Sequence, residues 1–186
     1  GCGCNGVATP SCLSFVNTLL DGDSSPDISQ ASPHALLSYL HLSHDFFLGF
    51  RLPGIRRDLI EVLGPDTDLK AAIMHYFDEY VEEVRRHMMY EEETVFPYVR
   101  SLLDGKPDKN YSIGIFRKNH DQVETKLTEL KQILIKYYPA KSTNTMNGVL
   151  FDIFNCEYDL AMHNDVEDRL FIPLISSLET PNKSNR

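Results

Sequence analysis

Residues 87–97 read HMMYEEETVFP and residues 163–173 read HNDVEDRLFIP. Both stretches contain a histidine, a glutamate four positions later, and a proline six positions after that glutamate. In an α-helix, a step of four residues places two side chains one turn apart on the same face. The two stretches therefore predict two helices related by an internal pseudo-twofold, in which Glu91 and Glu167 are equivalent carboxylates.

The sequence around these stretches has the apolar periodicity of long amphipathic helices. Apolar side chains recur at helical spacing in four segments, which end at Gly64-Pro65, at residues 104–107, near Pro139, and after the last apolar position. The apolar positions are Leu37, Leu40, Phe47, Ile55 and Leu59; Ile73, Phe77, Tyr80, Val84, Val95, Tyr98 and Leu102; Ile113, Phe116, Val123, Leu127, Leu130 and Leu134; and Val149, Ile153, Leu160, Leu170 and Leu174. No segment alternates with the two-residue period of a strand.

Because short loops force consecutive helices to run antiparallel, the sequence predicts an all-α, up-down-up-down four-helix bundle over residues 34–178. Pro33 is expected in the first turn of the first helix, with Ser32 as its cap. Residues 1–33 are interpreted as an N-terminal helical segment, around Leu13 to Leu20, followed by a linker. Residues 179–186 are interpreted as a C-terminal tail.

Every predicted helix places a histidine on its apolar stripe, and three of them add a glutamate four residues later. The candidate ligands are His44, His87, Glu91, His120, Glu124, His163 and Glu167. With 7 histidines and the glutamates of a 186-residue chain, roughly half a His-x3-Glu match is expected by chance, whereas the sequence has four. The fourth match, His75 with Glu79, falls on the polar face of its helix and is interpreted as a solvated pair.

The candidate carboxylates lie on apolar stripes, where an uncompensated charge would be expensive to bury. Either a buried His/Glu hydrogen-bond network or shared coordination of metal ions would compensate them, and no Arg or Lys shares the site. Imidazole with carboxylate and no thiolate favours iron, with manganese or zinc as substitutes. Seven ligands exceed the needs of one ion, so the sequence predicts two irons, bridged by two carboxylates and an oxide or hydroxide, with about one open position.

Composition excludes several other classes of protein. The 18 Lys and Arg against 27 Asp and Glu give a net charge of −9, with no basic cluster that would follow a phosphate backbone. A 42% hydrophobic content argues against wholesale disorder, and no apolar run has the length of a membrane span. The start of the chain lacks the features of a secretory leader and the four cysteines are scattered, so we expect a cytoplasmic protein.

Other residues have simpler interpretations. His41 is expected at the edge of the first stripe, His34 on the surface, and Cys156 as a buried structural thiol. Cys2, Cys4 and Cys12 form no recognised metal-site spacing. Six phenylalanines are expected mostly to fill the core: Phe46, Phe47, Phe96, Phe116, Phe154 and Phe171.

The joint pattern of an isolated histidine, two His-x3-Glu pairs and a further histidine resembles the hemerythrin-like, or HHE cation-binding, proteins. HMMYEEETVFP and HNDVEDRLFIP are most similar to the di-iron proteins for the repair of iron centres. The resemblance implies that His44, His87, His120 and His163 are terminal ligands and that Glu91 and Glu167 are bridges.

It also implies a small diatomic ligand, O₂ or NO, and a role in rescuing iron–sulfur proteins under nitrosative or oxidative stress. An alternative is an oxygen- or nitric-oxide-sensing module without turnover, and whether the chain is an enzyme stays open. Classical hemerythrins have a histidine where this chain has Glu124. Because negative charge stabilises the ferric state, we expect a poor reversible oxygen carrier.

Overall fold

The computed structural model describes residues 31–65, 67–106, 108–119, 125–137 and 143–180. Every regular element in these ranges is helical, which confirms the all-α fold class. The predicted N-terminal helical segment, with Cys2, Cys4 and Cys12, lies outside the described residues. The candidate ligands His120 and Glu124 also lie outside them.

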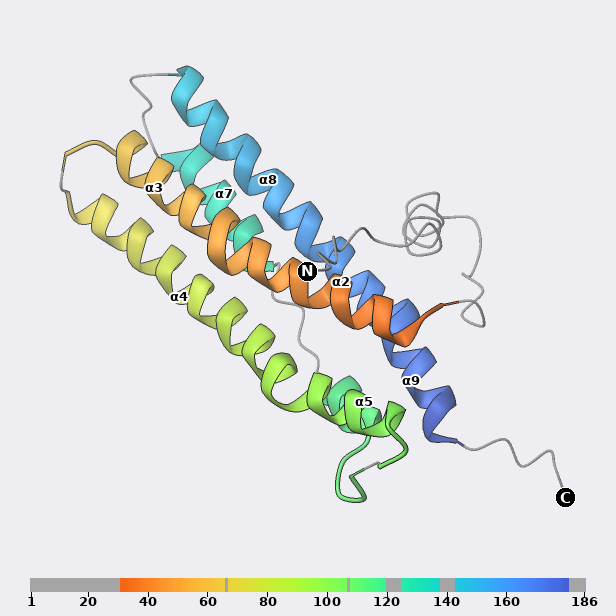
Figure 1. Cartoon of the computed structure of the whole chain (residues 1–186). Coiled ribbons are helices and arrows are strands. Elements are labelled where there is room, and N and C mark those ends of the chain that lie inside the picture. Colours follow the sequence, from red (N-terminus) through yellow and green to blue (C-terminus); the bar gives the residue numbers. More distant parts are fainter. Residues whose placement is uncertain (1–30, 66, 107, 120–124, 138–142, 181–186) are drawn as a thin grey trace, which may run out of the picture. The chain divides into compact units, whose positions relative to one another are not determined.

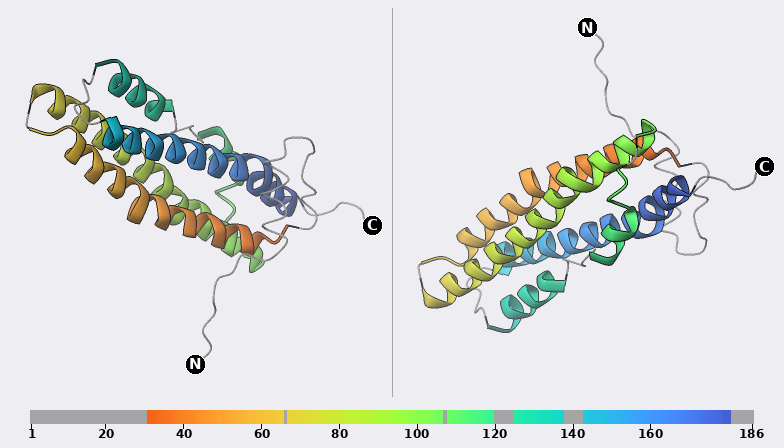
Figure 2. Two further views of the ribbon diagram at one scale, coloured as in Figure 1. Left: turned by 90° about the horizontal axis from the view of Figure 1, so that it is seen from above. Right: turned by 90° about the horizontal axis from the view of Figure 1, so that it is seen from below.

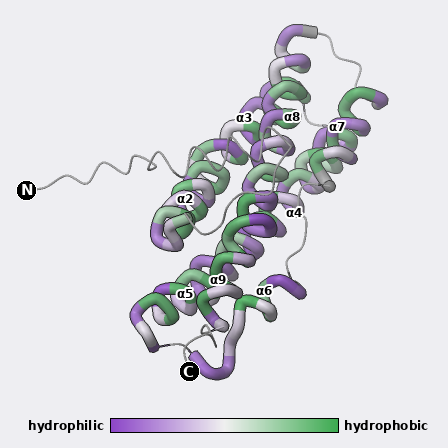
Figure 3. The backbone as a smooth tube through the Cα atoms, turned by 90° about the vertical axis from the view of Figure 1, so that its right-hand side faces the viewer, coloured by the Kyte–Doolittle hydropathy of each residue, from purple (hydrophilic) through white to green (hydrophobic). Residues whose placement is uncertain are grey.

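Along the chain the α-helices are interrupted by short π-helical turns, labelled η. The order is α2 (Pro33–Phe46), η2 (Phe47–Arg51), α3 (Leu52–Val62), α4 (Asp68–Tyr90), η3 (Glu91–Val95), α5 (Phe96–Leu103), α6 (Ile113–Asn119), α7 (Thr125–Tyr137), α8 (Thr143–Val166), η4 (Glu167–Phe171) and α9 (Ile172–Glu179). Purple and green alternate along the helical tube in Figure 3, as expected for amphipathic helices.

Capping residues and glycines mark several helix ends. Ser32 Oγ accepts a hydrogen bond from the Ala35 amide at 3.3 Å, so the serine caps α2. Thr67 caps α4 in the same way, because its Oγ1 accepts from the Lys70 amide at 3.1 Å. After α3 and α5 the chain turns at Gly64 and Gly105, whose φ angles of 66° and 73° favour glycine.

The chain divides into two compact units. Unit 1 comprises Gly1–Leu42, Glu92–His120 and His163–Arg186, and unit 2 comprises Ser43–Glu91 and Asp121–Met162.

In unit 2, α3, α4, α7 and most of α8 pack around one hydrophobic core, and these helices lie side by side in Figures 1 and 2. Each helix contributes residues from its predicted apolar stripe, such as Leu59, Phe77, Leu130 and Ile153. Polar side chains join neighbouring helices at the rim. Arg56 of α3 binds Asp78 of α4 through its Nε at 2.7 Å.

In unit 1, α9 packs against both α5 and α6. The Glu179 carboxylate at the end of α9 accepts hydrogen bonds from the Tyr98 hydroxyl at 2.5 Å and from the Ile113 amide at 2.7 Å. It therefore satisfies an amide in the first turn of α6. Phe96 and Phe171 are fully buried and pack edge to face, with ring centroids 6.0 Å apart.

The expectation that the six phenylalanines mostly fill the core is confirmed, and the two exceptions are Phe46 and Phe154. Their side chains are 40% and 49% exposed, whereas the other four are buried. Phe154 lies one residue beyond the buried Ile153, and one helical step of 100° turns it out of the core. The ammonium of Lys131 covers its ring, 4.1 Å from the centroid.

Candidate metal centre

Each described candidate histidine lies in the last turn of an α-helix, directly before a π-helical turn. His44 lies at the end of α2, His87 at the end of α4 and His163 at the end of α8. Glu91 and Glu167 are the first residues of η3 and η4. A π turn within an α-helix is rare, and such turns occur frequently at functional sites.

Prolines explain where these π turns occur. Each turn is followed by an α-helix whose second residue is proline: Pro53 in α3, Pro97 in α5 and Pro173 in α9. Proline lacks the amide hydrogen for the i−4 carbonyl, and its ring clashes with that carbonyl in a regular α-helix. A wider turn before the proline removes this conflict and lets the helix continue for several residues.

In unit 2 the Glu91 carboxylate lies between two imidazoles. Its Oε2 is 3.1 Å from His44 Nε2, and its Oε1 is 2.9 Å from His87 Nε2. Glu91 is completely buried, His44 is 3% exposed and His87 is 10% exposed. The structure thus brings these three candidate residues together, and each imidazole turns the same nitrogen toward the carboxylate.

In unit 1 the equivalent pair is His163 and Glu167. His163 Nε2 lies 3.5 Å from Glu167 Oε1, and the two side chains are 1% and 0% exposed. The neighbouring Asn164 is also buried. The internal repeat in the sequence therefore has a structural counterpart, because a completely buried carboxylate follows one turn after an imidazole that is at most 10% exposed in both places.

The pair His75 and Glu79 shows what the same spacing gives on a polar face. Their closest contact is 3.6 Å, and their side chains are 76% and 58% exposed. The prediction of a solvated pair is confirmed.

His41 of α2 and Glu92 of η3 form a hydrogen-bonded pair. His41 Nδ1 donates a hydrogen bond to Glu92 Oε1 at 2.9 Å, and Glu92 is only 22% exposed. Glu92 is therefore partly buried and paired with a histidine of another helix.

The buried donor set fits a metal ion. His44, Glu91, His163 and Glu167 are buried histidines and carboxylates that could hold one. Imidazole nitrogen and carboxylate oxygen are the ligands that iron, manganese and zinc accept, and ligand burial excludes competing water.

In the described part of the chain, no helix combines the length and the apolar character that a membrane span needs.

The sequence named the candidate ligands but gave no indication of the π turns beside them. The prolines could have indicated the π turns. Pro53 falls inside a predicted continuous helix, where proline is not tolerated without a local change of geometry. Pro97 and Pro173 are likewise followed by further helix, to Leu103 and Glu179.

Comparison with known proteins agrees with this geometry. Residues 51–175 match the hemerythrin HHE cation-binding domain. The match includes His87, Glu91, His163 and Glu167, and it begins after His44. No curated protein and no solved structure matches the chain. Because the matched residues make up more than half of the chain, this protein belongs to the hemerythrin HHE cation-binding family.

Proposed function

We propose that this protein holds a pair of non-haem irons and binds or reduces a small diatomic ligand, O₂ or NO. The proposed ligands are His44, His87, Glu91, His120, Glu124, His163 and Glu167. The imidazoles would be terminal ligands, Glu91 and Glu167 would bridge the ions together with an oxide or hydroxide, and manganese or zinc could substitute for iron.

The environment of Glu91 is the observation that carries the proposal. A fully buried carboxylate has an imidazole Nε2 within 3.1 Å of each of its two oxygens. A bridging carboxylate needs both oxygens directed toward different partners, and terminal histidines bind through one ring nitrogen. The same residue types recur at Glu167 and His163, so a second buried carboxylate is available for the second bridge.

The surroundings would protect such a centre from water. Phe96 and Phe171 follow η3 and η4, and both rings are fully buried. A bound iron pair would supply electrons and an open coordination position to the diatomic ligand. The chain's own contribution would be to fix the ligands in helix ends and to keep the site apolar around them.

We place this activity in the cytoplasmic repair of iron–sulfur centres, with apo-cluster proteins as partners. The support is the likeness of HMMYEEETVFP and HNDVEDRLFIP to repair-of-iron-centres sequences.

The test is to reduce the iron-loaded protein without oxygen, add NO or O₂, and follow its absorption spectrum. Ligand-dependent changes are expected in the wild type and in the control H75A, and not in H163A. Transfer of iron to an apo-cluster protein afterwards would support repair. Complete spectral recovery on ligand removal, without turnover or iron loss, would instead make the protein a sensor. An unchanged spectrum in the iron-loaded wild type would contradict both functions.

A further inference from the structure

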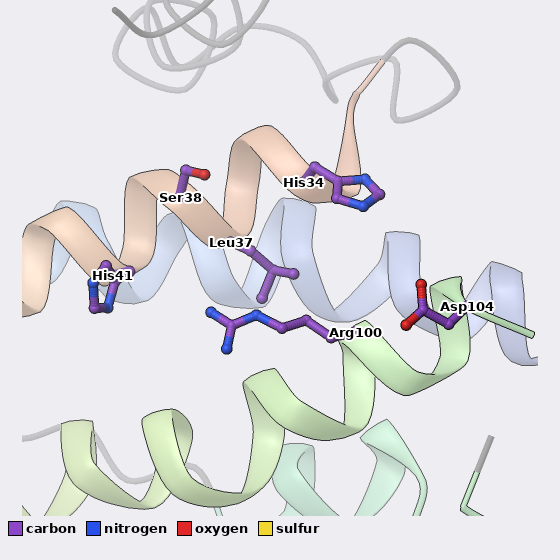
Figure 4. Close-up of a pocket in the computed structure, with 6 residues that line it drawn as sticks. All are labelled: His34, Leu37, Ser38, His41, Arg100 and Asp104. Atoms are coloured by element: carbon purple, nitrogen blue, oxygen red, sulfur yellow. The ribbon is translucent and has the colours of Figure 1, made fainter. Parts of the chain in front are cut away.

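One pocket in unit 1 is lined by residues that include no candidate metal ligand. It has a volume of about 370 Å³ and is lined by His34, Leu37, Ser38, His41, Arg100 and Asp104, as Figure 4 shows. The first four residues belong to α2, Arg100 belongs to α5, and Asp104 follows α5 directly. Pockets of this size take small organic molecules.

Arg100 is the charged group that defines this pocket. Among the described residues its side chain makes no hydrogen bond or ion pair, although Asp104 lies four positions later, directly after α5. In Figure 4 the Arg100 side chain extends away from Asp104, toward the part of α2 that carries Leu37 and His41, which explains why the two residues form no ion pair. A guanidinium presents five N–H donors in a planar fork that matches a carboxylate or phosphate.

The other lining groups suit an oxyanion with a short carbon skeleton. The Ser38 hydroxyl and the His34 ring can each donate a hydrogen bond. The hydrogen bond to Glu92 holds the His41 ring in place. Leu37 is 4% exposed and adds an apolar side chain to the lining.

Asp104 does not neutralise the guanidinium. Figure 4 shows Asp104 toward the His34 end of the pocket, away from the direction in which the Arg100 side chain extends. The guanidinium donors of Arg100 are thus not occupied by Asp104.

We propose that this pocket binds a small oxyanion, an organic acid or phosphate, through the Arg100 guanidinium. The apolar contact with Leu37 favours an organic acid over phosphate. This site is independent of the proposed iron centre, so a failure of either leaves the other standing.

The test is calorimetric titration of the full chain with succinate, with inorganic phosphate, and with neutral succinamide. We expect saturable succinate binding in the millimolar range or tighter, and no binding of succinamide. R100Q should weaken succinate binding by about tenfold or more, because it removes a charge-assisted bidentate contact. D104N should strengthen it about twofold to fivefold, because it removes a nearby negative charge.

R117Q is the matched control, since Arg117 of α6 is another exposed arginine without a partner among the described residues, outside the pocket. It should leave binding unchanged, and R100Q should keep the wild-type metal content. Tighter binding of phosphate than of succinate would assign the site to phosphate. The proposal is overturned if no probe binds saturably, if R100Q and R117Q behave alike, or if succinamide binds as well as succinate.

Discussion

At the scale of single residues, burial separates a ligand from a surface group with the same sequence spacing. His87 with Glu91 and His75 with Glu79 both lie four residues apart on the same helical rod, yet Glu91 is completely buried and Glu79 is 58% exposed. The apolar stripe predicted this difference, since only the first pair falls on it. The same holds for Phe46 and Phe154, which lie next to the stripe positions Phe47 and Ile153 and are exposed.

Cys156 gives a prediction about alkaline pH. Burial raises the pKa of its thiol to about 12, and Asp159, Asp152 and Glu157 act in the same direction against Arg51. In the unfolded chain the thiol ionises near its ordinary pKa of 9.0. Its contribution to stability is therefore complete below about pH 9 and is lost as the pH rises toward about 12.

The measurement is urea unfolding of the wild type and C156A at about pH 8 and about pH 10.5. At the lower pH we expect C156A to be less stable by about 1 kcal/mol, because a small side chain is deleted from the core. Between the two pH values the wild type should lose more stability than C156A. Equal losses would show that the thiol does not titrate differently in the folded and unfolded states.

At the scale of elements, the π turns are what the sequence analysis could not supply. The helices themselves follow from the 3.6-residue period and from capping residues such as Ser32 and Thr67. A π turn replaces the i−4 hydrogen bonds by i−5 hydrogen bonds over only five residues, which is too short a stretch for the apolar period to reveal it. The sequence feature that indicates each π turn is the proline two residues after it, as at Pro97.

Replacing Pro97 tests whether the π turn orients the ligands. In P97A an amide hydrogen is restored and the clash with the i−4 carbonyl disappears, so η3 can tighten to α geometry. We expect iron binding about tenfold weaker, because the Glu91 carboxylate would be reoriented. The metal-free protein should be as stable as the wild type or more stable. Iron titration and urea unfolding measure the two effects.

P33A is the control for that experiment, since Pro33 occupies the first turn of α2, where proline is well tolerated. It should bind iron as the wild type does. If P97A and P33A bind iron equally well, the π turn at Glu91 has no role in placing the ligand.

At the scale of the whole molecule, the sequence predicted the all-α fold class and the apolar residues of each helix. It did not predict the division into two units, because periodicity describes each helix separately and contains no information on how long helices are grouped. The candidate ligands were found because buried carboxylates in an acidic chain, with a net charge of −9, need compensation. His120 and Glu124 stay predictions.

Metal removal should lower the stability of the whole fold. A ligand that binds only the folded state stabilises it by mass action, so iron at about one hundred times its dissociation constant should raise the Tm by about 5 to 10 °C. Thermal unfolding followed by circular dichroism, with iron and with a chelator, measures this difference. The difference should persist in E79Q and shrink in E167Q. A chelator without effect on the wild-type Tm would contradict the prediction.

The central claim is that the buried histidines and glutamates hold an iron pair, and iron quantitation in E91Q and E79Q tests it most directly. Both variants replace a carboxylate by an amide of the same shape in the same His-x3-Glu spacing, one buried and one exposed. After expression with sufficient iron, the wild type and E79Q should each retain about two irons per chain, and E91Q clearly fewer. Iron-free wild-type protein, or equal iron in the two variants, would contradict the account.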